Sequence, residues 1–348
     1  MEAKDINIRE LASLAGVSIA TVSRVINNPQ LVQPDTREHV REVMRRVNYA
    51  PAWTVESRLS GRSRLIAFLF SEKDYYFYSS IRDGLESIVG LRGYTVLYCP
   101  IEAEPQRRSQ QLKTIFEQKL DGAIWALRDF HPEDIRMIDE RQVPLVLARK
   151  YDSAPADRYN CCYINFAEAS YRMTRHLLEM GHRRIGLMFE NVSQQFMNSF
   201  CQGWERALRE EQAPIEDDLL LNAPNTMQGG YTKAVELLER SEMPEAVFCA
   251  SDEQAFGVLK AAHEKGVPVP ERLAVAGFTD SPMSNLCDPE LTTIDLPIYR
   301  LGIIAARMLF DVIEDTGSEV TPGEVVLQPK LRIRRSCGNE KPINVLFE

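Results

Sequence analysis

Short, continuous apolar runs separated by helix-sized segments dominate the chain from Leu65 onward. These runs are LIAFLF, TVLYC, GAIWAL, PLVLA, RRIGLMF, EAVFCAS and LAVAGF. Strands that are apolar throughout belong to parallel sheets whose two faces are both covered by helices. The runs are too many for one small sheet. The sequence therefore predicts an α/β core made of two doubly wound parallel-sheet subdomains.

The first 50 residues follow a different pattern, which predicts three short helices. Asn7 and Glu10 form a capping box at the start of the first helix, and Gly16 ends it. Ser18 caps the second helix, and Pro34 lies in the first turn of the third. Their apolar stripes are Ile8, Leu11, Ala12 and Ala15, then Val22, Val25 and Ile26, then Val40, Val43, Met44 and Val47. Such short helices must pack together, and the first two form a helix-turn-helix.

Several segments, in this order, resemble the lactose-repressor/galactose-repressor (LacI/GalR) family of bacterial transcription regulators. Near the N-terminus they are IRELASLAGVSIATVSRVIN and TREHVREVMRRVNYAP. In the core they are HLLEMGHRRIGLM, ASDEQAFGVLKAAHEKGVPVPERLAVAGFTD and LTTID. The resemblance covers nearly the whole chain. It implies a sequence-specific DNA-binding regulator, expected to be a repressor, that binds a pseudo-palindromic operator as a homodimer. Control would come from a small-molecule effector, a sugar or an anionic sugar derivative.

The resemblance also implies a domain order. An all-α helix-turn-helix headpiece (1–50) is followed by a hinge helix or linker (51–64). The core (65–348) would be like the type I periplasmic sugar-binding proteins, with an N-subdomain of about 65–161 and 293–322 and a C-subdomain of about 162–290 and 324–336. The chain would cross between the subdomains near 161–164, 288–293 and 322–324. The effector is expected in the cleft, where the carboxyl ends of strands converge.

The second helix, which begins at Ser18, is expected to enter the major groove of DNA. Arg24 is the strongest candidate base reader, because a guanidinium can bind guanine O6 and N7 together. Ile19 and Ala20 have no side-chain donors and would instead contact a thymine methyl group. The other predicted DNA-binding residues are Asn7, Ser18, Thr21, Ser23, Asn27 and Tyr49, most of them as phosphate contacts. Thr21 and Ser23 have an alternative role, in which they only cap or solvate the helix.

The hinge departs from the family pattern by one residue. Tyr49-Ala50-Pro51 is followed by AWTVESRL, so a strict count from Pro51 places Arg58 where the family has a leucine. In the family that leucine wedges into the minor groove. We favour Leu59 for this role because it is the apolar candidate. A hinge this short is not expected to be helical alone, and should become ordered when two hinges meet on DNA.

The candidate effector contacts combine an aromatic set with an unusual polar set. They are Phe77, Tyr78, Trp125, Arg149, Asn198, Ser251, Asp252 and Thr279. Family sugar sites use an arginine, an asparagine and an acid at positions that here hold Asn198, Ser251 and Thr279. Arg149, where an acid is frequent, suggests an anionic effector such as a uronic acid or sugar phosphate. The alternatives are that Arg149 pairs with nearby surface acids and that Asp252 caps a helix.

Motifs for catalysis or metal binding are missing from the sequence. It has no GxSxG, P-loop or zinc signature, and its five histidines show no partnered spacing. We therefore expect a protein that is not an enzyme and has no cofactor. The seven cysteines are expected to be reduced, with redox sensing at Cys161-Cys162 as the minor alternative.

The main rival function is a transport-type sugar-binding protein that regulates no gene. Such a protein must be exported, yet the N-terminus MEAKDINIRE has neither the basic nor the apolar region of a signal peptide. No apolar run could span a bilayer. We expect a cytoplasmic protein, located at the nucleoid when bound to DNA, without a membrane partner. The C-terminal CGNEKPINVLFE has no long heptad run, which argues against a tetramerising coil.

Overall fold

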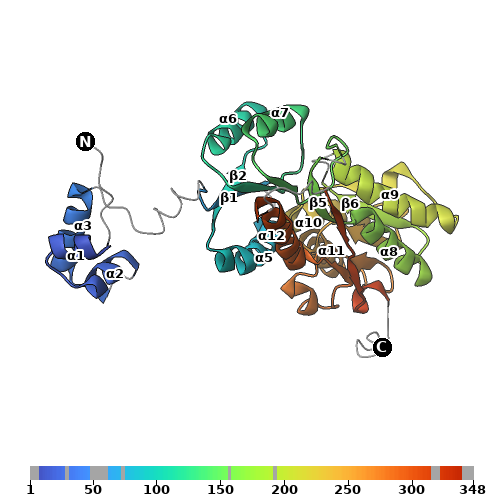
Figure 1. Ribbon diagram of the computed structural model, residues 1–348. Helices are drawn as coiled ribbons and strands as arrows, with labels where there is room; N and C mark the ends of the chain where they lie inside the picture. Colours follow the sequence, from blue (N-terminus) through green and yellow to red (C-terminus); the bar gives the residue numbers. More distant parts are fainter. Residues whose placement is uncertain are drawn as a thin grey trace, which may run out of the picture. The chain divides into compact units, whose positions relative to one another are not determined.

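The computed structural model describes residues 8–27, 31–47, 62–71, 75–155, 158–190, 194–314 and 322–338. The chain divides into two compact units (Figure 1). The first consists of Met1–Arg64 with Lys119–Asp121, and the second of Leu65–Gln118 with Gly122–Glu348.

The described part of the first unit contains three helices, as the sequence predicts. They are α1 (Ile8–Leu14), α2 (Ile19–Asn27) and α3 (Pro34–Arg46). Gly16 takes a left-handed conformation (φ +63°) in the turn between α1 and α2. The helices enclose a small core of Leu11, Ala12, Ala15, Val22, Val25, Val40 and Val43. Asn7, Tyr49 and the hinge residues 51–61 lie outside the described residues.

The second unit begins with a six-stranded parallel sheet in the order β11-β5-β4-β3-β1-β2. Its strands are β1 (Leu65–Ser71), β2 (Thr95–Ile101), β3 (Gly122–Trp125), β4 (Leu145–Leu147), β5 (Asn160–Ile164) and β11 (Glu324–Leu327). The flanking helices are α5 (Tyr75–Val89), α6 (Pro105–Phe116), α7 (Pro132–Arg141) and α12 (Ile298–Glu314). In Figure 1, α6 and α7 lie on one side of the sheet, and α5 and α12 on the other.

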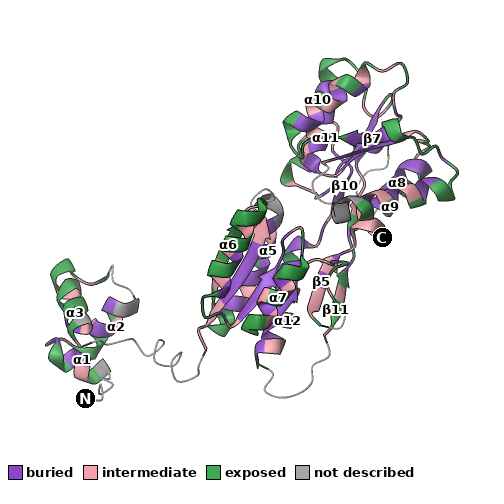
Figure 2. Cartoon of the chain, turned by 90° about the horizontal axis from the view of Figure 1, so that it is seen from above, coloured by how far each residue is buried: buried purple, intermediate pink, exposed green. Residues whose placement is uncertain are grey.

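A second parallel sheet has the order β7-β6-β8-β9. Its strands are β6 (Ile185–Phe189), β7 (Leu220–Asn222), β8 (Ala246–Cys249) and β9 (Ala274–Ala276). Its helices are α8 (Phe166–Glu179), α9 (Gln194–Glu210), α10 (Met227–Leu238) and α11 (Asp252–Glu264). Buried residues concentrate in the strands and exposed ones on the outer helix faces (Figure 2). The predicted α/β core with two doubly wound subdomains is therefore confirmed.

Short 3₁₀ helices complete the second unit: η3 (Gly90–Arg92), η4 (Asp217–Leu219), η5 (Pro282–Asn285) and η6 (Arg335–Cys337). A separate antiparallel pair joins β10 (Thr293–Asp295) and β12 (Lys330–Arg332). None of the described helices combines the length and the apolar character that a membrane span requires.

The sheet assignments correct the expected crossing points. Cys162–Ile164 and Glu324–Leu327, which we expected in the C-subdomain, pair with each other in the first sheet. Thr292 and Asp295 form bridges with Ala276 and Thr279 on the side of the second sheet, so the second crossing follows Asp295 rather than preceding it. A parallel strand keeps its ladder up to its carboxyl end, and the chain can leave the sheet only there. Each crossing therefore falls a few residues later than the sequence indicates.

Candidate DNA-binding helix and ligand pocket

One face of α2 is packed and the other is open. Val22 and Val25 are buried in the core of the first unit. Ile19, Ala20 and Arg24 are exposed, and 46% of Ile19 is accessible although it is a large apolar residue. An exposed apolar side chain beside an exposed guanidinium fits a helix that reads base edges. These three residues are therefore placed as the predicted reading face requires, but their contacts with DNA stay a prediction.

Ser18 has an observed structural role at the start of α2. Its Oγ accepts a hydrogen bond from the Thr21 backbone N–H at 3.0 Å and lies 2.8 Å from the Thr21 hydroxyl. This is the capping interaction that the sequence predicts. It does not test the phosphate contacts predicted for Ser18, Thr21 and Ser23. The side chain of Asn27, with Asn7, Tyr49, Arg58 and Leu59, lies outside the described residues.

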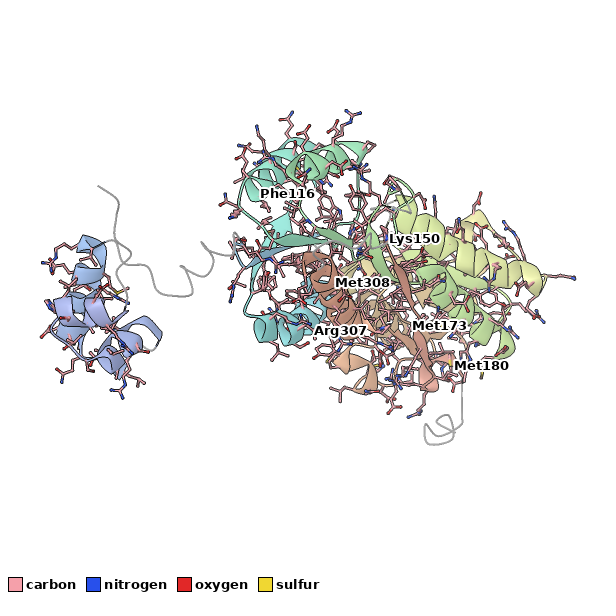
Figure 3. The ribbon with its side chains drawn as sticks, viewed as in Figure 1. Phe116, Lys150, Met173, Met180, Arg307 and Met308 are labelled. Carbon is pink, nitrogen blue, oxygen red and sulfur yellow. The ribbon has the colours of Figure 1, made fainter. Side chains whose placement is uncertain are left out.

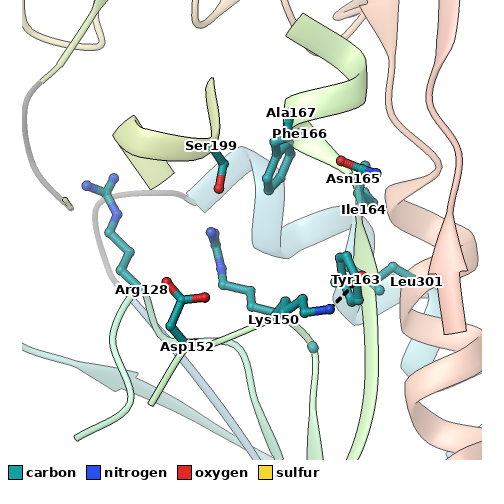
Figure 4. Close-up of a pocket in the computed structure, with 12 residues that line it drawn as sticks. Arg128, Lys150, Asp152, Tyr163, Ile164, Asn165, Phe166, Ala167, Ser199 and Leu301 are labelled. Atoms are coloured by element: carbon teal, nitrogen blue, oxygen red, sulfur yellow. Dashed lines mark hydrogen bonds between the residues drawn. The ribbon is translucent and has the colours of Figure 1, made fainter. Parts of the chain in front are cut away.

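A pocket of about 190 Å³ lies where the carboxyl ends of β3, β4 and β5 face the first turn of α8 and the second turn of α9 (Figure 4). It is lined by Arg128, Ala148, Arg149, Lys150, Asp152, Tyr163, Ile164, Asn165, Phe166, Ala167, Ser199 and Leu301. Strand ends of one parallel sheet and helix starts of the other subdomain thus meet at this pocket. Ligands of doubly wound proteins bind in such places.

Lys150, labelled in Figure 3, is held in place by Tyr163 of β5 and Glu324 of β11. Its Nζ lies 3.1 Å from Glu324 Oε1 and 3.3 Å from the Tyr163 hydroxyl, and Tyr163 donates to the same Glu324 oxygen at 2.6 Å. The hydrogen bond to Glu324, followed by that to Tyr163, raises the pKa of Lys150. The same contacts, led by that of Tyr163, lower the pKa of Glu324. Lys150 is therefore charged at neutral pH.

Arg149 is the one predicted effector residue that lines this pocket. Its Nη2 donates to the Tyr78 hydroxyl at 3.3 Å, and Tyr78 in turn donates to the Ala126 carbonyl at 2.8 Å. The Nε atom of Arg149 is buried. Tyr78 is 2% exposed and positions the guanidinium from behind the pocket wall.

Other predicted effector residues lie elsewhere. Trp125 is fully buried, and its indole N–H donates to the Asp129 carbonyl at 3.1 Å. Asn198 directly precedes the pocket residue Ser199 but does not itself line the pocket. Thr279 follows β9, and its N–H donates to the Ile294 carbonyl at 3.0 Å. The Phe77 side chain lies outside the described residues.

Ser251 and Asp252 form buried hydrogen bonds. Ser251 caps α11 by accepting from the Gln254 N–H at 3.2 Å. The Asp252 carboxylate, fully buried, accepts from the hydroxyls of Thr293 at 2.6 Å and Ser284 at 2.8 Å. It also accepts from the Ser281 N–H at 2.6 Å. Asp252 thus joins α11 to the loop after β9 and to β10, and its role toward an effector stays a prediction.

The sequence analysis missed several pocket residues, including Arg128, Lys150, Tyr163 and Phe166. The signal that could have found Arg128 and Lys150 is their position, because each lies shortly after the carboxyl end of a predicted strand. Tyr163 and Phe166 lie at the end of β5 and the start of α8, and no apolar run predicted β5. Of the positions implied by the family resemblance whose side chains are described, only Arg149 lines the pocket.

Cys161 and Cys162 lie in β5 behind this pocket. Desolvation by burial raises the pKa of Cys161 to about 12 and that of Cys162 further. Both are thus protonated at neutral pH, which disfavours the redox alternative. Within the described residues, no cluster of three or more His, Cys, Asp or Glu side chains could hold a metal ion.

Comparison with known proteins agrees with this architecture. The family model described as "Bacterial regulatory proteins, lacI family" matches residues 7–52, and one for a "Periplasmic binding protein-like domain" matches residues 174–337. The "HTH-type transcriptional repressor PurR" of Actinobacillus pleuropneumoniae serotype 5b (strain L20) is 27% identical over 333 residues, which are 95% of this chain and 98% of that protein. The "Catabolite control protein A" of Staphylococcus epidermidis (strain ATCC 12228 / FDA PCI 1200) is 29% identical over 329 residues, 94% of this chain and 98% of that protein.

A solved structure described as "transcriptional regulator CelR-cellobiose complex" has a TM-score of 0.71 and 28% identity, and the match covers 95% of this chain and 99% of that one. A helix-turn-helix unit and two parallel-sheet subdomains in one chain define a DNA-binding transcriptional regulator. The chain belongs to the LacI family of bacterial regulatory proteins. Its relatives named above are regulators rather than enzymes.

Proposed function

We propose that this regulator is a homodimeric repressor that binds a pseudo-palindromic operator and is controlled by a small sugar or sugar-derived effector in the pocket. The observation that carries the proposal is that one chain combines an exposed reading face on α2 with a pocket lined from both subdomains. The relative named as a repressor supports the repressor role, and the cellobiose bound in the solved structure of a relative supports a sugar effector.

In this proposal Arg24 reads a guanine, and Ile19 and Ala20 select a thymine by contact with its methyl group. Ser18, Thr21 and Ser23 position the helix on phosphates. One small headpiece reads few base pairs, whereas two headpieces related by a twofold axis double the site and match its palindrome. The hinge (51–64), with Leu59 as the minor-groove wedge, completes the DNA-binding region.

Control by the effector follows from linkage. Arg149 and Lys150 come from the first subdomain, and Phe166 and Ser199 from the second. A ligand that touches both sides favours one arrangement of the two subdomains over another. If the two arrangements also differ in their affinity for DNA, the ligand changes the DNA affinity of the protein. This control needs no catalytic step. A protein that binds an operator would work in the bacterial cytoplasm, whereas transport-type sugar-binding proteins are exported.

The proposal is tested by gel-shift titration of the full chain. The operator is first selected from a pool of double-stranded DNA with randomised inverted repeats. We expect the full palindrome to bind far more tightly than a single half-site of equal length. Equal affinity for the two would contradict the homodimer. A screen of sugars added to the bound complex then tests effector control.

Arg24→Ala is the matched variant in the same titration. Loss of a bidentate base contact should cost about 1–3 kcal/mol on the selected operator and much less on random DNA. An equal loss on both DNAs would show that Arg24 contacts phosphate only. Arg37→Ala, on α3, serves as a control for the removal of one positive charge from the headpiece.

A further inference from the structure

We infer that Asp121 is a positioning residue for DNA binding. Its carboxylate holds the two residues before β1 in one conformation, and this conformation limits the separations that the two headpieces of a dimer can take. The role assigned to Asp121 rests on the proposed function, because it concerns how a dimer matches a palindromic operator. It goes further by naming a side chain outside the headpiece that sets the spacing of the half-sites.

The Asp121 carboxylate binds Ser63 and Arg64, which directly precede β1. Its Oδ1 accepts hydrogen bonds from the Ser63 backbone N–H at 2.8 Å and from the Ser63 hydroxyl at 3.0 Å. Its Oδ2 accepts a hydrogen bond from the Arg64 backbone N–H at 2.8 Å. Successive backbone N–H groups that point at one anion form a nest, a geometry that favours negative charge. Because both oxygens accept, a carboxylate fits here better than an amide.

Arg64 has a backbone conformation that needs support from its surroundings. Its φ angle is +59°, in the left-handed region that is unfavourable for residues with a side chain. Such a conformation persists where neighbouring contacts hold it in place. The hydrogen bond from the Arg64 N–H to Asp121 is a contact of this kind. Without the carboxylate, we expect Ser63 and Arg64 to take several conformations in place of one.

The carboxylate is presented by a closely packed part of the chain. β3 begins with Gly122, directly after Asp121, and pairs in parallel with β1, which begins directly after Arg64. A Cβ on Gly122 would lie 2.8 Å from the Leu309 Cδ1 of α12, so the start of β3 lies close against that helix. Asp121 therefore stands one residue before the β1–β3 pairing, where its own backbone has little freedom.

Ser63 and Arg64 join everything that precedes them, including the headpiece, to β1. In a dimer each headpiece must reach its own half-site, and the two half-sites lie at a fixed separation on the DNA. A held connection restricts the separations that the headpieces can take. A loose connection lowers the effective concentration of the second headpiece at its half-site and tolerates more separations. Asp121 thus acts on the pair of headpieces, whereas the base contacts of each one stay the same.

The test is a gel-shift titration of the full chain on related DNAs. They are the selected operator, a single half-site of equal length, and operators with one base pair added or removed between the half-sites. We expect the unmodified chain to lose affinity steeply when the spacing changes. Asp121→Ala should bind the selected operator roughly tenfold more weakly, because the effective concentration of the second headpiece falls. It should bind the half-site as the unmodified chain does and depend less on spacing.

The deciding quantity is the ratio of the affinities for the operator and the half-site. A fraction of unfolded protein would weaken both affinities by the same factor, so a role of Asp121 in folding alone would leave the ratio unchanged. If Asp121→Ala keeps the ratio and the spacing dependence of the unmodified chain, Asp121 is not a positioning residue for DNA binding.

Further variants identify the contact. Asp121→Asn keeps one accepting oxygen and should give an intermediate ratio, and it replaces Asp121→Ala if that variant does not fold. Ser63→Ala removes the hydroxyl but keeps both backbone N–H donors, so its effect should be smaller than that of Asp121→Ala. Glu117→Ala is the matched control, since Glu117 is an exposed acid at the end of α6. A change in the ratio for Glu117→Ala as large as for Asp121→Ala would contradict a specific contact.

The unmodified chain separates this inference from the proposed function. If it binds the operator and the half-site equally, the proposed homodimer fails, whatever the variants do. If it prefers the operator and Asp121→Ala keeps the same preference, the proposed function stands and only the role of Asp121 fails.

Discussion

His176, near the end of α8, is a buried histidine that joins the last described residues to the second subdomain. Its Nε2 lies 3.2 Å from the Cys337 Sγ, which also accepts a hydrogen bond from the Thr292 hydroxyl at 3.0 Å. His182 contacts the Cys337 carbonyl at 3.1 Å. Desolvation by burial lowers the pKa of His176, although Glu179 opposes this effect. The native protein thus holds a neutral imidazole here.

The lowered pKa makes stability depend on pH. The unfolded chain binds a proton at His176 with the ordinary pKa of 6.5, whereas the native state does not until the pH is lower. The stability gained from this histidine is therefore complete above about pH 6.5 and falls as the pH drops toward the folded pKa, by at most about 1.4 kcal/mol per pH unit. Denaturant unfolding between pH 7 and 5 should show a smaller loss of stability for His176→Gln than for the unmodified chain.

His263→Gln is the control for this prediction, because His263 is exposed on α11. It should leave the pH dependence unchanged. Equal pH dependence for His176→Gln and the unmodified chain would show that His176 does not contribute to acid sensitivity.

At the scale of elements, three pairs of helices pack closely because each contact contains a glycine. A Cβ on Gly302 of α12 would lie 2.2 Å from the Ile81 carbonyl oxygen of α5. A Cβ on Gly203 of α9 would lie 2.1 Å from the Ala167 carbonyl oxygen of α8. A Cβ on Gly230 of α10 would lie 2.1 Å from the Gln254 carbonyl oxygen of α11. The obstacle is backbone in each case, so a side chain could be accommodated only by moving a helix.

Gly302→Ala should destabilise the core by about 1–3 kcal/mol, as expected for an overpacked interface. Ala favours helices intrinsically, so any loss must come from the contact with α5. Gly90→Ala is the matched control, because no atom lies within 4 Å of a Cβ placed there. Denaturant unfolding of the two variants measures the difference. A Gly302→Ala protein as stable as Gly90→Ala would mean that α5 and α12 separate at little cost.

A comparison of the predicted and observed strands shows which elements can be recognised from the sequence alone. Runs such as LIAFLF and EAVFCAS predicted β1 and β8 correctly because both strands are buried on both faces. The edge strand β11 was missed, since its residues alternate between exposed and buried and form no apolar run. The crossing points depend on which strands pair across long sequence separations. Such pairing leaves no local mark in composition or periodicity.

At the scale of the whole molecule, the chain has separate hydrophobic cores. The headpiece core contains Leu11 and Val22, and the large core of the second unit contains residues such as Leu187 and Phe248. Because the headpiece is small, its stability rests on a handful of side chains. Damage to one core should therefore leave the other unit folded.

Leu11→Ala tests this separation. Leu11 is fully buried, and its truncation should cost about 2–5 kcal/mol, enough to unfold a headpiece of this size. We expect operator binding to be lost while the calorimetric transition of the core stays where it was. Leu187→Ala, in β6, should instead lower the transition of the core. A shift of the core transition in Leu11→Ala would show that the units unfold together.

The site was predicted less fully than the fold. Arg24 and Ile19 lie on the exposed face that helical spacing requires, because that face follows from local periodicity. The pocket is different, since its cations come from the ends of two strands whose neighbours are set by sheet order. Arg149 was found through comparison with a family pattern, whereas Arg128 had no signal other than its place after a strand.

The last described segment, residues 322–338, has a consequence for how the protein is made. It supplies β11 to the first sheet, β12 as the partner of β10, and η6, whose Ser336 hydroxyl donates to the Val275 carbonyl beside the second sheet at 2.6 Å. During translation the headpiece leaves the ribosome first and can fold at once. The first sheet lacks its edge strand β11, and β10 lacks its partner β12, until the final stretch of the message has been read. A premature stop codon shortly before residue 322 would therefore yield a chain that retains the DNA-reading helix but lacks a complete ligand-responsive core.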